Sequence, residues 1–244
     1  MRVLCWFSCG SASAVAAKLA VEKYGNDCEV IYCDTLAHEH TDNIRFLKDV
    51  ETWLGIKIKI LKSKKYKDIF DVFDRTNFLV GPKGLALCTI ELKKRLRYEY
   101  QLPSDLHVIG YTKEEGKRIN RLKKEEFTDF YFPLHENGLS KRDCHKIIAE
   151  AGIEQPEMYK LGFRNNNCIG CVKGGAGYWN HVRKVFPYAF ERMAKQERKM
   201  GATILSDRRK GKNRARLYLD QLDPNSGRME KESDIECGVL CAIK

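Results

Sequence analysis

The chain has 244 residues, of which 43% are hydrophobic, enough for one large α/β domain or for one domain plus a smaller appendage. No basic leader with an apolar core and no apolar run of about 18 residues is present, so we expect a cytoplasmic protein outside the secreted and membrane classes. The net charge of +11 predicts polyanionic partners such as nucleic acid or a phosphorylated nucleotide. Ten cysteines in a cytoplasmic chain favour metal binding or thiol chemistry over disulfides.

The first segment joins an apolar run to a turn of small residues. Val3 to Phe7 is short and apolar, which predicts a buried central strand of a parallel sheet. In the turn that follows, small residues let backbone N–H groups and a helix N-terminus approach an anion. The loop is either a phosphate or sulfate cradle or an ordinary turn with a serine N-cap. Its candidate ligands are Ser8, Cys9, Gly10, Ser11 and Ser13.

Strand patterns alternate with helical ones through the first half of the chain, which predicts βαβ units and a parallel sheet. The carboxyl ends of parallel strands share one edge, so Asp34 and Thr35, and also Gly110, are expected beside the serine loop. We divide the chain into a nucleotide-binding domain, residues 1–135, and a helical, cysteine-containing part, residues 136–244. The further strands are expected at 29–33, 56–60 (toward one edge), 106–110 and 130–134.

Three helices have recognisable boundaries. Thr89 is the expected N-cap of a basic helix, which places Cys88 at a helix N-terminus. A second helix opens at Ser140 and stops at Gly152. A third covers 178–200, with a break at Pro187. Beyond it, the positive run at 210–216 is either a solvated loop or a phosphate contact.

The cysteines separate into two groups. Cys5, Cys28, Cys33 and Cys144 fall within strand or helix patterns, so we expect them to be core residues. Cys168 and Cys171 stand three apart in a Gly/Asn loop, a spacing typical of half a tetrahedral thiolate site. A redox pair or chance occurrence stays possible. The remaining ligands would come from Cys88, Cys237 and Cys241, which leaves one thiol for attack on a sulfur or phosphorus centre.

The sequence resembles the phosphoadenosine phosphosulfate reductase family of the adenine nucleotide α-hydrolase (PP-loop) superfamily, particularly its uncharacterised bacterial and phage members. The matching positions are the Ser8–Ser13 loop, Tyr32-Cys33-Asp34-Thr35, Glu115 with Arg118 after Gly110, the spacing of Cys88 from Cys168, and Glu236-Cys237-Gly238. Three positions depart from the family. Ala12 stands where ATP-pyrophosphatase members have aspartate, Thr89 stands where cluster-bearing reductases have a second cysteine, and no histidine follows the tail motif.

This resemblance implies a Rossmann-like, doubly wound, five-stranded α/β fold and a sulfonucleotide reductase-like enzyme. Lys93 and Arg118 would neutralise charge on the nucleotide, and Cys237 would attack the sulfuryl sulfur. A thioredoxin-like dithiol would then release sulfite. The resemblance also implies a [4Fe-4S] cluster, or zinc, held by Cys88, Cys168, Cys171 and Cys241.

Two other functions remain open. One is an ATP-dependent sulfurtransferase that modifies nucleic acid, and the other is a non-enzymatic nucleotide- or nucleic-acid-binding module with a structural metal. The sequence leaves open whether the nucleotide is phosphoadenosine phosphosulfate, adenosine phosphosulfate or ATP.

Overall fold

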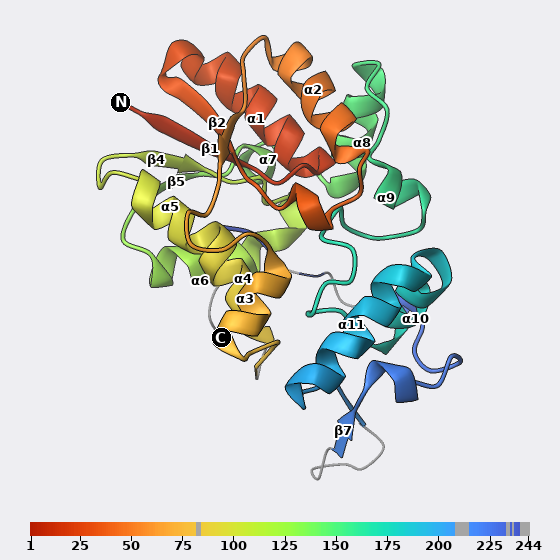
Figure 1. Ribbon diagram of the computed structural model, residues 1–244. Helices are drawn as coiled ribbons and strands as arrows, with labels where there is room; N and C mark the ends of the chain where they lie inside the picture. Colours follow the sequence, from red (N-terminus) through yellow and green to blue (C-terminus); the bar gives the residue numbers. More distant parts are fainter. Residues whose placement is uncertain (82–83, 208–214, 233–234, 236, 240–244) are drawn as a thin grey trace.

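The computed structural model describes residues 1–81, 84–207, 215–232, 235 and 237–239 (Figure 1). The predicted fourth metal ligand, Cys241, lies outside the described residues, as do Glu236 and most of the positive run at 210–216.

A five-stranded parallel sheet forms the centre of the larger body (Figure 1). Its strand order is β3-β2-β1-β4-β5, so the N-terminal strand is central and β3 is at one edge, as predicted. In the register, Val3 of β1 lies opposite Cys28 on one side and Leu106 on the other. The strands are β1 (Val3–Phe7), β2 (Cys28–Cys33), β3 (Lys59–Leu61), β4 (Leu106–Val108) and β5 (Asp129–Tyr131).

Helices cover both faces of this sheet, because alternate residues of the central strand point to opposite sides. Val3, Cys5 and Phe7 pack in one core, and Leu4 and Trp6 pack in another. The first face is covered by α1 (Ser11–Tyr24), α2 (Asn43–Leu54), α7 (Pro133–Glu136) and α8 (Lys141–Glu150), the second by α5 (Arg95–Tyr100) and α6 (Gly116–Glu125). The predicted doubly wound α/β fold is confirmed.

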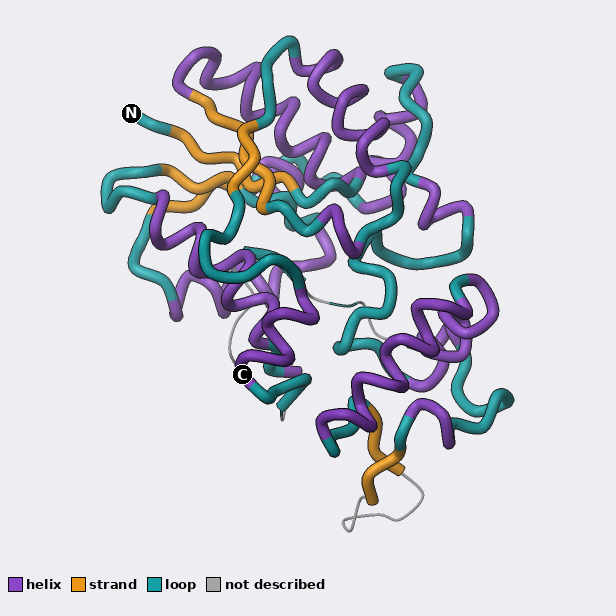
Figure 2. The backbone as a smooth tube through the Cα atoms, viewed as in Figure 1, coloured by secondary structure: helices purple, strands orange, loops and turns teal. Residues whose placement is uncertain are grey.

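A second body of helices lies below the sheet in Figure 2 and has its own apolar core around the fully buried Trp179. Pro187 begins α11, as the predicted break requires. The division of the chain at residue 135 stays a prediction. This body contains α3 (Ile69–Thr76), α4 (Leu87–Thr89), α10 (Ala176–Val185), α11 (Pro187–Met200) and the antiparallel pair β6 (Leu205–Asp207) and β7 (Ala215–Leu217), and α9 (Glu157–Lys160) contributes Met158 to its core.

Short helical turns make up the remaining elements. The turns are η1 (Gly25–Asp27), η2 (Leu36–His38), the π-helical η4 (Ile90–Lys94), η5 (Lys113–Glu115), η7 (Leu219–Gln221) and η8 (Met229–Lys231). Among the described residues, no helix has both the length and the apolar character needed to span a membrane.

Several predicted boundaries are wrong. The third strand begins at Lys59 and not at residue 56, because the Ile58 N–H donates to the Glu51 side chain, and the fourth strand ends at Val108 and not at residue 110.

Thr89 is not an N-cap: α4 starts at Leu87 after Ala86, and the Thr89 hydroxyl lies 3.4 Å from the Cys237 sulfur instead. The fifth strand ends at Tyr131 because Pro133, which has no N–H for a strand ladder, takes the first position of α7. The helix from Ser140 and its stop near Gly152 are confirmed.

Candidate active site

A cavity of about 380 Å³ lies at the carboxyl edge of the sheet. The residues that follow β1 and β4, the segment after α9, and the tail around Cys237 all contribute to its wall. Several residues of the segment after Gly110 also line it, namely Tyr111, Thr112, Glu114, Glu115 and Arg118. Seven of the predicted site residues meet here, namely Ser8, Gly10, Ser13, Lys93, Gly110, Arg118 and Cys237.

The loop after β1 is held in shape by the Ser13 hydroxyl. This oxygen accepts hydrogen bonds from the N–H groups of Ser8 (3.1 Å) and Gly10 (3.3 Å) and donates to the Gly10 carbonyl (2.8 Å). Gly110 allows β4 to approach closely, because a Cβ there would lie 3.0 Å from the Ala12 carbonyl oxygen and from the Ser13 Cα. The loop is therefore a preformed, tightly packed wall of the cavity.

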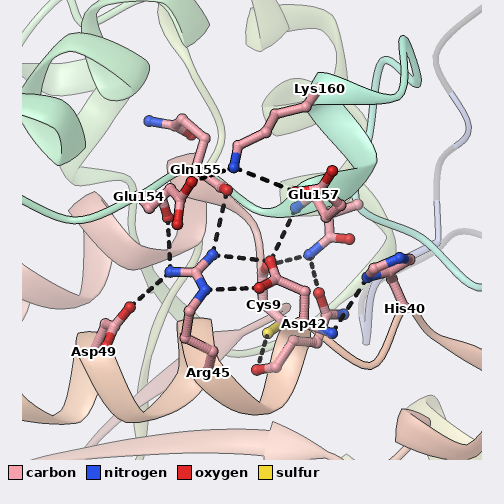
Figure 3. A network of polar contacts seen from close by, with 11 residues as sticks. Cys9, His40, Asp42, Arg45, Asp49, Glu154, Gln155, Glu157 and Lys160 are labelled. Carbon is pink, nitrogen blue, oxygen red and sulfur yellow. Dashed lines mark hydrogen bonds and ion pairs between the residues drawn. The ribbon is translucent and has the colours of Figure 1, made fainter.

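Cys9 and Ser11, also predicted to bind the nucleotide, do not line the cavity. The Cys9 thiol is buried 3.5 Å from the Asn43 carbonyl (Figure 3), and the Ser11 hydroxyl donates to the Gln155 side chain at 2.5 Å. Both side chains are used to pack the loop against neighbouring segments. Their role in binding stays a prediction.

An ion-pair network fastens the chain between α8 and α9 to the start of α2 (Figure 3). Arg45 pairs with Asp42 (2.6 Å) and Asp49 (2.7 Å) and also donates to the carbonyls of Glu154 and Gln155. The hydrogen bond from Arg45 lowers the pKa of Asp42. This attachment brings the next turn, which carries Tyr159, over the loop after β1.

Asp34 and Thr35 follow β2 as predicted but are not among the residues that line the cavity. Asp34 pairs with Lys62 at 2.9 Å. Thr35 is buried and donates to Glu39 at 2.5 Å, and Glu39 also accepts from Tyr32 at 2.8 Å. A nucleotide role for the two residues stays a prediction.

Asn166 connects the cysteine segment to the loop after β1. Its buried amide nitrogen donates to the Cys9 carbonyl (2.6 Å) and to the Asn43 side-chain oxygen (2.7 Å). Asn43 in turn donates to Glu39 at 2.6 Å. The position of the cysteines relative to the loop is therefore fixed by buried hydrogen bonds.

Cys168 and Cys171 lie in a turn that Tyr178 closes. The Cys171 N–H donates to the Tyr178 hydroxyl (2.9 Å), which donates to the Cys168 carbonyl (3.1 Å). Gly170 between them has φ +75°, and a Cβ there would lie 3.2 Å from the Trp179 ring. Only glycine combines this backbone conformation with this close approach at low cost.

Cys237 brings thiol chemistry into the cavity. Its side chain lines the cavity and is in hydrogen-bond contact with Cys171. That contact lowers the pKa of Cys237 well below its usual value; burial opposes the shift, and nearby Lys93 adds to it. The same contact, with burial, raises the pKa of Cys171.

Lys93 is the buried cation of the site, with 8% of its surface exposed. Burial disfavours its charge, but the acidic groups of Cys237, Cys168 and Glu39 outweigh burial and raise its pKa. Lys93 is therefore charged at neutral pH, beside both the cavity and the thiols.

The predicted metal ligands are only partly assembled. Cys88, Cys168 and Cys171 lie near Cys237, and thiols are the ligands that iron–sulfur clusters and zinc prefer. Within the described ranges, however, no group of three or more Cys, His, Asp or Glu side chains is placed to hold a metal ion. The donor chemistry of these thiols fits a thiolate-bound metal. The predicted cluster or zinc stays a prediction.

The cysteines predicted to be core residues are buried, whereas several residues of the cavity wall were not predicted. Cys5, Cys28, Cys33 and Cys144 are buried, as predicted. Three parts of the cavity wall were not predicted from the sequence, namely Tyr159, Lys141 and the run Asn165–Asn167. The three consecutive asparagines just before a CxxC pair were the available signal, because such a polar run is unusual beside buried cysteines.

Comparisons with known proteins show which fold the chain has but do not assign it to a family. No family model matches. The chain is 23% identical over 208 residues to the uncharacterized protein MJ0066 of Methanocaldococcus jannaschii, covering 78% of this chain and 40% of that protein. The chain thus spans two fifths of that relative's length.

Two solved structures are similar in fold. Phosphoadenylyl-sulfate (PAPS) reductase from Candida auris, in a phosphate complex, superposes with a TM-score of 0.51 at 13% identity over 69% of this chain and 81% of that one. The U34-tRNA thiolase NcsA from Methanococcus maripaludis, with its [4Fe-4S] cluster, gives 0.45 at 14% identity over 82% and 73%. The superposition on the Candida auris reductase shows that the chain shares that fold, and the resemblance seen in the sequence is confirmed at the level of the fold.

Proposed function

We propose that this protein is a sulfonucleotide reductase-like enzyme that binds an adenylyl nucleotide and cleaves it at its sulfate end. The observation that carries this proposal is that Cys237, Lys93 and the Ser8–Ser13 loop line one cavity. A thiol, a buried cation and a loop with a helix N-terminus are the groups that attack on an anionic sulfur centre requires.

The reaction begins with the Cys237 thiolate. Its sulfur attacks the sulfuryl sulfur of the nucleotide, an S–S bond forms, and the bond from that sulfur to the bridging phosphate oxygen breaks. The electron pair of the broken bond leaves with the nucleotide phosphate, and Cys237 becomes an S-sulfonate. One thiol of a thioredoxin-like dithiol then attacks the Cys237 sulfur, sulfite leaves with the bonding electron pair, and the second thiol displaces Cys237 as a free thiol while the dithiol becomes a disulfide.

Two cations have proposed electrostatic roles. Lys93 would stabilise the charge that grows on the leaving phosphate, because it is buried and lines the cavity next to Cys237. Arg118 pairs with Glu115 and lies 4.2 Å from the centre of the Tyr111 ring, which orients it in the same wall. The proposed role of Arg118 is to bind the nucleotide and not to act on the Cys237 thiol.

The test compares Cys237→Ser with the wild type. We expect sulfite release from adenosine phosphosulfate or its 3′-phosphorylated form, with dithiothreitol as reductant, to be lost in the variant while calorimetric nucleotide binding persists. Cys28→Ser is the matched control, because Cys28 is the first residue of β2 and the cavity lies at the other, carboxyl ends of the strands. Normal turnover by Cys237→Ser would remove Cys237 as the nucleophile.

A second candidate is an ATP-dependent sulfurtransferase acting on nucleic acid. The net charge of +11, with Arg118 and Lys141 both in the cavity wall, favours a polyanionic substrate. This function predicts pyrophosphate release from ATP and RNA or DNA binding that weakens steeply between about 50 and 200 mM salt. Sulfite release without ATP cleavage would instead support the reductase.

A further inference from the structure

The helix α6 carries a run of positive charge next to the cavity. Half of its ten residues are basic, and its one acidic residue, Glu125, stands at its end. Arg118, in the first turn of α6, lines the cavity, so the basic run begins at the cavity wall. The basic residues are Lys117, Arg118, Arg121, Lys123 and Lys124.

The other side of α6 is buried, which fixes the direction of its basic face. Ile119 and Leu122 pack in the core on the second face of the sheet. Lys117, Lys123 and Lys124 are exposed. A helix of ten residues is about 15 Å long, so this basic face can contact more than one phosphate of a nucleic-acid backbone.

A fully exposed aromatic side chain follows this helix. Phe127 comes two residues after the end of α6 and follows Lys123 and Lys124 of its last turn. Of the eleven phenylalanines in the chain, Phe127 is the one that is exposed. Its ring therefore contributes no buried area to the folded chain, and an exposed ring beside lysines is an arrangement on which unpaired bases stack.

A second exposed ring, Tyr98, is tied to the residue before Phe127. The Tyr98 hydroxyl donates to the Glu126 carboxylate at 3.0 Å. Glu126 also forms ion pairs with Arg97 (2.7 Å) and with Lys94 (3.4 Å). The acidic charge next to Phe127 is thus neutralised within the protein, which removes its repulsion of a phosphate backbone.

We propose that the basic face of α6 and the Phe127 ring bind single-stranded nucleic acid, with phosphates along the helix and a base stacked on the ring. The cations alone would suit a duplex equally well, but a ring can stack only on a base that is unpaired. A strand bound in this way reaches the cavity wall at Arg118. The inference goes beyond the proposed reaction and does not depend on it.

The first test removes the ring. Fluorescence anisotropy measures the affinity of the full chain for labelled RNA and DNA strands of mixed sequence, about 12 nucleotides long. We expect Phe127→Ala to bind about tenfold more weakly than the wild type, because one stacked base is lost. Tyr188→Ala is the matched control, since Tyr188 is also an exposed ring on a basic helix, α11, and its loss should leave the affinity unchanged. Binding of either strand supports the inference, and the tighter of the two identifies the preferred sugar.

The second test removes charge. Lys123→Gln combined with Lys124→Gln should make the slope of log affinity against log salt shallower by about 1.4, since each lost phosphate contact accounts for about 0.7. Lys64→Gln combined with Lys67→Gln lowers the net charge equally, at exposed positions between β3 and α3, and should keep the slope of the wild type.

Four results would overturn the inference. They are no binding of either strand at about 50 mM salt, equal losses in the α6 variants and in their controls, binding of a duplex of the same length at least as tight as that of the single strand, and a change of oligomeric state in Phe127→Ala without weaker strand binding. The last result would make the ring a contact between protein copies. Unfolding midpoints check that each variant is folded. None of these measurements needs turnover, so the inference and the proposed function are tested separately.

Discussion

Replacing Asn166 with alanine tests the connection between the cysteine segment and the loop after β1. The substitution removes hydrogen bonds from the Asn166 amide to the Cys9 carbonyl (2.6 Å) and to the Asn43 side-chain oxygen (2.7 Å). Asn166 is 6% exposed, and Cys9 and Asn43 are fully buried. Each of the two buried acceptors left without its donor costs about 1–3 kcal/mol, so we expect the free energy of unfolding to fall by about 2–6 kcal/mol.

Urea unfolding measures this change, and the midpoint should fall with an unchanged m-value. Nucleotide binding should weaken as well, because the carbonyl that loses its partner belongs to the loop. Asn165→Ala is the matched control: Asn165 is half-buried and accepts from Lys141, so we expect a cost below about 1 kcal/mol. Equal losses in the two variants, or a loss below about 1 kcal/mol for Asn166→Ala, would refute the reasoning.

Three further predictions concern other parts of the chain. Gly110→Ala should weaken nucleotide binding and lower the free energy of unfolding by about 1–3 kcal/mol, because the added Cβ would press on the backbone at Ala12 and Ser13. Calorimetry measures the binding and urea unfolding measures the stability. Unchanged binding would contradict this prediction. Burial raises the pKa of Glu197 to about 7. The native state then holds a proton that the unfolded state has released, so stability should fall by about 3 kcal/mol as the pH rises from about 4.5 to 7; Glu197→Gln, followed by urea unfolding, should flatten this slope. If the predicted cluster exists, anaerobically purified protein should contain iron and sulfide and absorb broadly in the visible range, and Cys168→Ser should lose all three; zinc alone, or no metal, would contradict the cluster.

Local patterns predicted those parts of the structure that neighbouring residues determine. The apolar run of β1 and the break at Pro187 each express a short-range preference, and each is confirmed. The same holds for the helix that opens at Ser140, where the structure shows a capping box with Asp143. The loop after β1 leads into α1 as expected, but Gly10 and not a serine is the N-cap, and the role of the loop as an anion cradle stays a prediction. The prediction that Thr89 is an N-cap is wrong, because its hydroxyl instead contacts the sulfur of Cys237, a residue far away in the sequence.

The composition of the cavity wall could be predicted only in part. Ser8, Gly110 and Arg118 follow strands of the sheet, so their convergence follows from the topology. Tyr159 reaches the cavity because Arg45 attaches the preceding segment to α2. Asn166 reaches it because its side chain forms buried hydrogen bonds to α2 and to the loop after β1. Such tertiary contacts leave no periodic signal in the sequence.

The central claim is that the Cys237 sulfur takes the sulfonate group from the nucleotide. The most direct measurement mixes the protein with adenosine phosphosulfate, or its 3′-phosphorylated form, carrying radiolabelled sulfur, quenches within the first turnover and locates the label. The account predicts label on the peptide that contains Cys237 and none on the protein in Cys237→Ser. Label on the protein in Cys237→Ser, or label that stays on bound nucleotide in the wild type, would contradict it.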